Sequence, residues 1–114
     1  MANPNLGQVH LQAGDEEYRI SFGINALCEL EDVFGKSVQK IVEEDLNGDD
    51  ITMKAVRNVV WAGLLDQHPE ITVKEAGNVV SKAGMQNCMD AISKAFALAF
   101  PEAKGSKNPR RGRG

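Results

Sequence analysis

Residues 59–77 read VVWAGLLDQHPEITVKEAG, and this stretch describes one helix that ends and another that begins. Pro69 has no backbone N–H and pushes the preceding residue out of helical conformation, so the first apolar run ends at His68. Thr72 and Glu75 have the spacing of a capping box, in which each side chain bonds to the backbone of the other residue. The stretch therefore predicts a tight corner between two helices.

Two short segments near the start of the chain alternate apolar and polar residues, as half-buried strands do. The first runs from Val9 to Ala13 and the second from Tyr18 to Phe22. Gly14 lies between them and can adopt the positive φ of a tight turn. We expect a β-hairpin over about residues 7–22, packed on helices because an isolated hairpin is marginally stable in water.

The apolar spacing then changes to a period near 3.6, which predicts helices. Asn25 and Thr52 are expected N-caps, and Gly35 and Gly84 are expected to end their helices. The predicted helices cover residues 25–34, 37–45, 52–67, 72–83 and 86–100. Their core-facing residues are expected to include Ile24, Leu27, Leu30, Phe34, Val38, Ile41, Val42, Met53, Val56, Val59, Val60, Leu64, Met89, Ile92, Phe96 and Ala99.

The chain divides by charge into an acidic body and a basic tail. Residues 1–100 hold eight Lys or Arg and fifteen Asp or Glu, whereas residues 101–114 hold five Lys or Arg and one Glu. We predict an α+β, mainly α fold: one domain over residues 1–103, with the hairpin packed on five helices. Residues 104–114 have no apolar anchor and are expected to be disordered. Their cations are Lys104, Lys107, Arg110, Arg111 and Arg113.

Arginine and glycine alternate at the end of this tail, as in segments that contact single-stranded nucleic acid. The tail lacks interleaved aromatic residues, and the acidic body opposes binding to nucleic acid. A solubilising terminus and a docking arm for an acidic surface are the other interpretations, and nucleic acid is not the expected partner.

Localisation follows from what the sequence lacks. No apolar run approaches the roughly 20 residues that span a bilayer, and residues 1–7 do not resemble a secretory signal. We therefore expect a cytoplasmic protein without a membrane partner. Cys28 and Cys88 lie in apolar helical patterns and are expected to be small buried hydrophobes.

The sequence gives little support for metal binding or catalysis. Asp45, Asn47 and Asp49 have the alternation of a calcium loop, but Gly48 is in the fourth position and Val56 in the twelfth, where a carboxylate is needed. We interpret this segment as a solvated acidic turn.

The two histidines also lack the neighbours that catalysis or metal binding requires. Neither His10 nor His68 has a second ligand at metal-binding spacing, and no nucleophile or phosphate-loop motif is present. His68 is expected to interact with free carbonyls at a helix end. The residues favour a binding protein without a cofactor rather than an enzyme.

Two glycines lie inside the predicted helices, where glycine lowers helix stability by roughly 1 kcal/mol relative to alanine. We interpret them as positions where close packing requires the absence of a side chain. Gly63 lies near the end of the third helix and Gly77 lies early in the fourth. We expect them to let these two helices cross closely, while a notch for a partner helix is the alternative.

The corner and two further segments resemble one protein family. The segments are W-A-G-L-L-x-x-H-P-x-I-T-x-x-x-A-G at residues 61–77, F-x-x-N-A-L-C-E-L-E at residues 22–31 and AFALAFPE at residues 95–102. They resemble a small tail protein family of gene transfer agents and related prophages. Its members look like tail assembly chaperones, and the same family also carries the label of tail tube protein.

The resemblance implies a non-enzymatic chaperone in the bacterial cytoplasm that binds the tape-measure and tail tube proteins during tail assembly. The alternative is a structural tail component, at the tube or its end, that stays in the particle. Tube subunits are rich in β-structure, whereas this sequence predicts one hairpin and five helices, so the chaperone is the leading hypothesis. A small nucleic-acid binder that acts through its tail is the third.

A binding protein needs an exposed apolar surface, and the corner is the predicted place for it. Trp61 is the candidate anchor because tryptophan is enriched at interface hot spots. The same patch could join copies of the chain, and the alternative that Trp61 fills the core stays open. The predicted patch consists of Trp61, Leu65, Ile71 and Val73.

Overall fold

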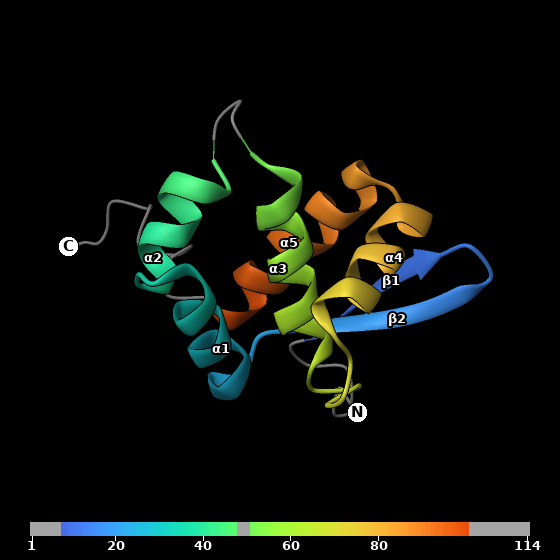
Figure 1. The fold of residues 1–114 in the computed structure, drawn as a ribbon, viewed down its shortest axis with the longest axis horizontal. Helices are drawn as coiled ribbons and strands as arrows, with labels where there is room; N and C mark the ends of the chain where they lie inside the picture. The colour runs from blue at the N-terminus through green and yellow to red at the C-terminus, as the bar shows by residue number, and fades with distance from the viewer. Residues whose placement is uncertain (1–7, 48–50, 101–114) are drawn as a thin grey trace.

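A computed structural model describes residues 8–47 and 51–100 of the chain (Figure 1). A two-stranded hairpin precedes the helices, and in Figure 1 α3 lies between α1 and α4. The elements are β1 (Gln8–Ala13), β2 (Glu16–Ser21), α1 (Ile24–Phe34), α2 (Val38–Lys40), the π-helical turn η1 (Ile41–Asp45), α3 (Met53–Leu64), α4 (Val73–Ala83) and α5 (Met85–Ala99). The predicted hairpin, helices and fold class are confirmed.

The hairpin is antiparallel, with Leu11 opposite Tyr18 and Ala13 opposite Glu16. Gly14 has φ +63°, which is the left-handed conformation that the short turn requires. The inward side chains of Leu11, Ala13 and Ile20 are buried against the helices. β1 packs on α4 and α5, and β2 packs on α3 and α5, so the hairpin is held by three helices.

Helix α1 begins one residue before the predicted start. Its N-cap is Gly23 without a side-chain hydrogen bond, so the prediction that Asn25 caps it was wrong. Gly35 ends it at φ +70°, and its N–H donates to the Glu31 carbonyl, as predicted. Ile24 is 75% exposed instead of buried, because it lies on the outer face of α1 together with the exposed residues Cys28 and Asp32.

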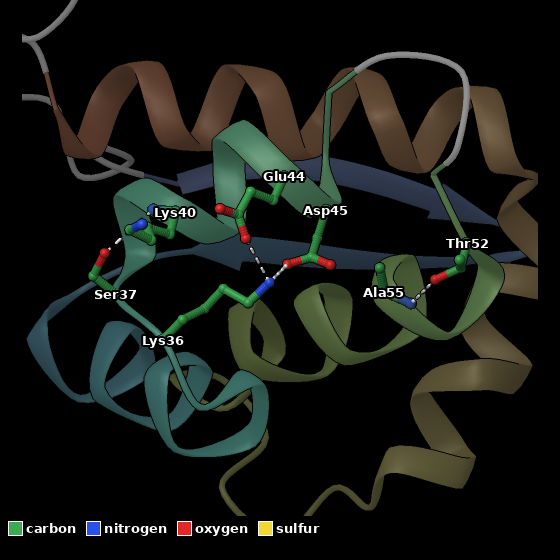
Figure 2. A network of polar contacts seen from close by, with 7 residues as sticks. All are labelled: Lys36, Ser37, Lys40, Glu44, Asp45, Thr52 and Ala55. Carbon is green, nitrogen blue, oxygen red and sulfur yellow. Dashed lines mark hydrogen bonds and ion pairs between the residues drawn. The ribbon is translucent and has the colours of Figure 1, made fainter.

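The predicted helix over residues 37–45 consists of one turn of α2 and the wider turn η1. Ser37 caps α2, and Lys36 Nζ donates to Glu44 at 3.0 Å and to Asp45 at 2.8 Å (Figure 2). These carboxylates raise the pKa of Lys36, through its hydrogen bonds to Asp45 first and Glu44 second. The widened turn leaves Val42 exposed, so the prediction of a buried side chain there was wrong.

Helix α3 forms the centre of the core. Thr52 caps it by accepting from the Ala55 N–H at 3.0 Å, as predicted (Figure 2). The helix ends at Leu64 instead of Gln67, and Met53 in its first turn is 75% exposed where burial was predicted. Its buried side chains are Ala55, Val56, Asn58, Val59, Val60, Ala62 and Leu64.

Gly84 separates α4 from α5 at φ +92°, as predicted for a residue that ends a helix. Phe96 of α5 stacks on Phe22 with ring centroids 4.3 Å apart, which joins this helix to the end of the hairpin. The predicted face of α5 is rotated, since Met89, Phe96 and Ala99 are only partly buried. The fully buried residues are Cys88, Ala91, Ile92 and Ala95.

Only one of the two helical glycines makes the predicted contact. A Cβ on Gly63 would lie 2.6 Å from Ile20 Cγ2, so this glycine admits strand β2 rather than α4. A Cβ on Gly77 would lie 3.1 Å from Arg57 Cδ, so Gly77 does allow α4 to approach α3. The prediction for Gly63 was wrong, and its close contact is with the hairpin.

Candidate protein-binding surface

Backbone hydrogen bonds hold the corner between α3 and α4. The His68 N–H donates to the Leu64 carbonyl at 2.8 Å, and the Ile71 N–H donates to the His68 carbonyl at 3.0 Å. The predicted capping box is present: Thr72 Oγ1 accepts from the Glu75 N–H, and Glu75 Oε1 accepts from the Thr72 N–H, both at 3.0 Å. This segment is therefore an ordered part of the fold.

The four residues of the predicted patch are all half-buried. Trp61 Nε1 donates to the Ile71 carbonyl at 3.0 Å, and both side chains pack against the core. Leu65 and Val73 flank them at the end of α3 and the start of α4. Trp61 thus has a clear structural role, while the patch as a partner surface stays a prediction.

An open groove separates the hairpin from this corner, and sequence reasoning did not find it. Tyr18 and His68, which both line it, have ring centroids 5.6 Å apart, and outside its lining Ser21 Oγ donates to Asp66 at 3.4 Å. The Tyr18 hydroxyl donates to Glu16 at 2.6 Å, and this bond, together with burial, raises the pKa of Tyr18. The lining residues are Glu16, Glu17, Tyr18, Gln67, His68, Pro69, Glu70, Ile71, Glu75, Asn78, Val79 and Lys82.

Two of the candidate metal ligands, His10 and Asp45, make ordinary surface contacts. His10 pairs with Glu17 across the hairpin, and Asp45 pairs with Lys36 (Figure 2). Within the described ranges, three or more His, Cys, Asp or Glu residues nowhere gather as a metal-binding group. The acidic turn at residues 48–50 lies outside the described residues.

The two cysteines lie in opposite environments. Cys28 is exposed on α1, so the prediction of a buried thiol there was wrong: it shares a helix face with Ile24, not with Leu30. Cys88 is buried as predicted, and burial raises the pKa of its thiol to about 11. Cys28 is therefore the accessible thiol of the pair.

The described residues also leave large apolar side chains exposed, which the sequence periodicity did not identify. They are Ile24, Val33, Val42, Met53 and Leu98. None of the helices described is long and apolar enough to cross a membrane. The basic tail, with Lys104, Lys107, Arg110, Arg111 and Arg113, lies outside the described residues.

Comparison with protein families matches residues 6–102 to the family described as phage tail tube protein, GTA-gp10. The chain belongs to this family. The predicted relation to gene transfer agent and phage tail proteins is confirmed, and the protein is a phage-type tail protein. No curated protein and no solved structure matches the chain. The family description favours the predicted alternative, a structural tail component, over the chaperone hypothesis.

Proposed function

We propose that this protein is a structural component of a phage-type tail, located in the tube or at its end and retained in the particle. The observation that carries the proposal is the family match over residues 6–102, which includes every helix and strand described. The protein works by contact with neighbouring tail proteins and performs no catalysis. The tube protein and the tape-measure protein are its proposed partners.

The arrangement of polar groups supports a contact function. Among the described residues, the groups with shifted pKa values are Tyr18, Lys36 and Cys88, and they lie in separate parts of the fold. Each shift has a local cause, either a neighbouring carboxylate or burial, and none pairs a general acid with a general base. The exposed apolar side chains supply contact area instead.

Assembly chaperone is the second candidate function, and the helical content of the fold favours it. The described residues form a sheet of two strands beside five α-helices, whereas a closed β-barrel needs many paired strands. A chaperone of this kind would bind the tape-measure and tube proteins and leave before the particle matures. Retention in the particle is what separates the two functions.

Quantitative mass spectrometry of particles purified on a density gradient tests the proposal. The expected result is a fixed copy number of this protein per particle, unchanged after high-salt washing. Particles with complete tails that lack the protein, while the unassembled fraction contains it, would contradict the proposal and support the chaperone. The portal or major capsid protein, measured in the same samples, provides the internal standard for particle number.

A further inference from the structure

Two exposed apolar side chains mark two different surfaces of the molecule. Ile24 at the start of α1 and Met53 at the start of α3 are each 75% exposed. A single exposed apolar residue is ordinary on a protein surface. These two are of interest because their charged neighbours have opposite signs.

The surface beside Met53 is a groove between the start of α3 and the end of α4. Gly77 and Gly84 leave it open, and the half-buried side chains of Val80 and Met85 form its apolar wall. Its charged lining residues are basic, and no acidic residue of the described chain lines it. The complete lining is Met53, Lys54, Arg57, Gly77, Val80, Ser81, Gly84 and Met85.

Arg57 provides a second indication that this groove receives an acidic partner. Its side chain lies against Gly77, where a Cβ would be 3.1 Å from Arg57 Cδ. The Arg57 Nε atom is buried and makes no hydrogen bond within the described residues. Neither Lys54 nor Arg57 forms an ion pair with a described residue.

The outer face of α1 has the complementary character. Ile24, Cys28 and Asp32 follow one another at intervals of four residues, which places them on one exposed face, and Glu29 lies beside them. Helix α1 contains no basic residue. Neither Glu29 nor Asp32 forms an ion pair with any residue in the described ranges. This face therefore presents apolar side chains next to carboxylates that pair with no described residue.

We propose that the outer face of α1 of one copy docks into the α3–α4 groove of a second copy. Ile24 and Cys28 contact the apolar wall of the groove, and the carboxylates of Glu29 and Asp32 face Lys54 and Arg57. A second copy is the occupant that the observations favour, because both halves of the contact are on the same chain with opposite charge. The acidic body as a whole repels itself, so this local pairing selects one orientation.

The two halves of this contact lie on different parts of the molecule: in Figure 1, α1 lies at the lower left, whereas the start of α3 and the end of α4 lie higher and to its right. Such a contact is heterologous: each copy offers both halves, so the association repeats into a ring or a filament. The inference rests on the proposed function in one respect, since a repeated contact suits a component that is present in many copies.

Mixing two interface variants tests the contact in the purified full-length chain. Ile24→Ser removes the α1 half and Met53→Ser removes the groove half, and both positions are exposed enough to leave folding intact. By sedimentation velocity, wild type is expected to form oligomers that grow with concentration. Each variant alone is expected to associate at least about tenfold more weakly. An equal mixture is expected to stop at a dimer, because it has only one intact contact.

Leu98→Ser is the matched control, because Leu98 is 46% exposed on α5, outside both halves of the proposed contact, and its substitution is expected to leave association unchanged. A charge exchange provides the rescue: Asp32→Lys or Lys54→Glu alone weakens association, and the double variant restores it. Circular dichroism of every variant verifies the fold. Unchanged association of Ile24→Ser, growth of the mixture beyond a dimer, or failure of the rescue would overturn the proposal.

The outcomes for this contact and for the proposed function are separable. Wild type that stays monomeric at every concentration, together with a fixed copy number in particles, overturns the contact and leaves the structural function standing. Oligomers that respond to the variants as described, together with particles that lack the protein, support the contact and overturn the structural function.

Discussion

The corner at residues 61–77 differs from the α1 face and the α3–α4 groove in how far its apolar side chains are exposed. In the corner, Trp61 is half-buried and its indole N–H is already bound to the Ile71 carbonyl. On α1, Ile24 is three-quarters exposed, and the nearby Glu29 and Asp32 have no ion-pair partner in the described chain. The indole N–H of the corner therefore has its partner within the fold, whereas the apolar and acidic side chains of α1 are available to a partner.

This difference separates a segment that carries the family resemblance, and is fixed by its own contacts, from the surfaces that we propose to bind a second copy. The corner is distinctive because a capping box and Pro69 fix its geometry, and these constraints serve folding. A docking surface only needs exposed apolar area and complementary charge, and many sequences provide that. The following variants test this distinction, in order of decreasing expected effect.

Leu64→Ala is expected to have the largest effect on stability. Leu64 is fully buried at the end of α3, so truncation should lower the free energy of unfolding by about 2–5 kcal/mol. Urea denaturation followed by circular dichroism measures the change. Leu98→Ala removes the same atoms from a side chain that is 46% exposed and should cost less than half as much. Equal losses would contradict the assigned burial.

Gly63→Ala is expected to lower the free energy of unfolding by about 1–3 kcal/mol, because the new Cβ would lie 2.6 Å from Ile20 Cγ2. The better helix propensity of alanine offsets part of this cost. Gly23→Ala is the control, because a Cβ there meets no atom within 4 Å. A stabilised Gly63→Ala variant would show that β2 and α3 are not in close contact.

Thr72→Ala is expected to cost about 1 kcal/mol, because it removes one of the two bonds of the capping box at the start of α4. Thr72→Ser retains the hydroxyl and should lose less than half of that amount. Thermal and urea unfolding of the two variants provide the measurement. If serine and alanine destabilise the protein equally, the side-chain cap does not contribute.

Thiol reactivity is expected to distinguish the two regions without changing stability. A disulfide reagent near neutral pH should label Cys28 rapidly and Cys88 only on unfolding, because Cys88 is buried with a pKa raised to about 11. Cys28→Ser should abolish the rapid phase. Rapid labelling of both thiols in native protein would contradict the assigned environments.

The same buried thiol affects stability at alkaline pH. Because the folded state raises the pKa of Cys88 above its ordinary value of 9.0, the unfolded state ionises first. Its contribution to stability is present below about pH 9 and is lost as pH rises toward 11. The stability of Cys88→Ala should therefore fall less steeply over this range than that of wild type.

The sequence predicted the features that depend on neighbours along the chain. The capping box at Thr72, the cap at Thr52 and the left-handed Gly35 each require only a few local residues, and the structure confirms them. Periodicity also identified which face of α3 is buried. It failed at the starts of α1 and α3, where Ile24 and Met53 were expected in the core and are each 75% exposed.

The site depends on contacts between distant segments, so the sequence predicted less of it. The close neighbour of Gly63 is Ile20 on the hairpin, and the α3–α4 groove exists only because Gly77 lies beside Arg57. No local pattern encodes either contact. The predicted patch around Trp61 remains a prediction, while the exposure of Cys28 was missed because its helix face was misassigned.

A cryo-electron microscopy reconstruction of the mature tail tests the central claim most directly. If the protein is a structural component, repeated density for the hairpin and helices described here should be present in the tube or at its end. The contact between copies should place α1 of one copy against the α3–α4 groove of the next. A complete tail whose density is fully explained by other chains would contradict the account.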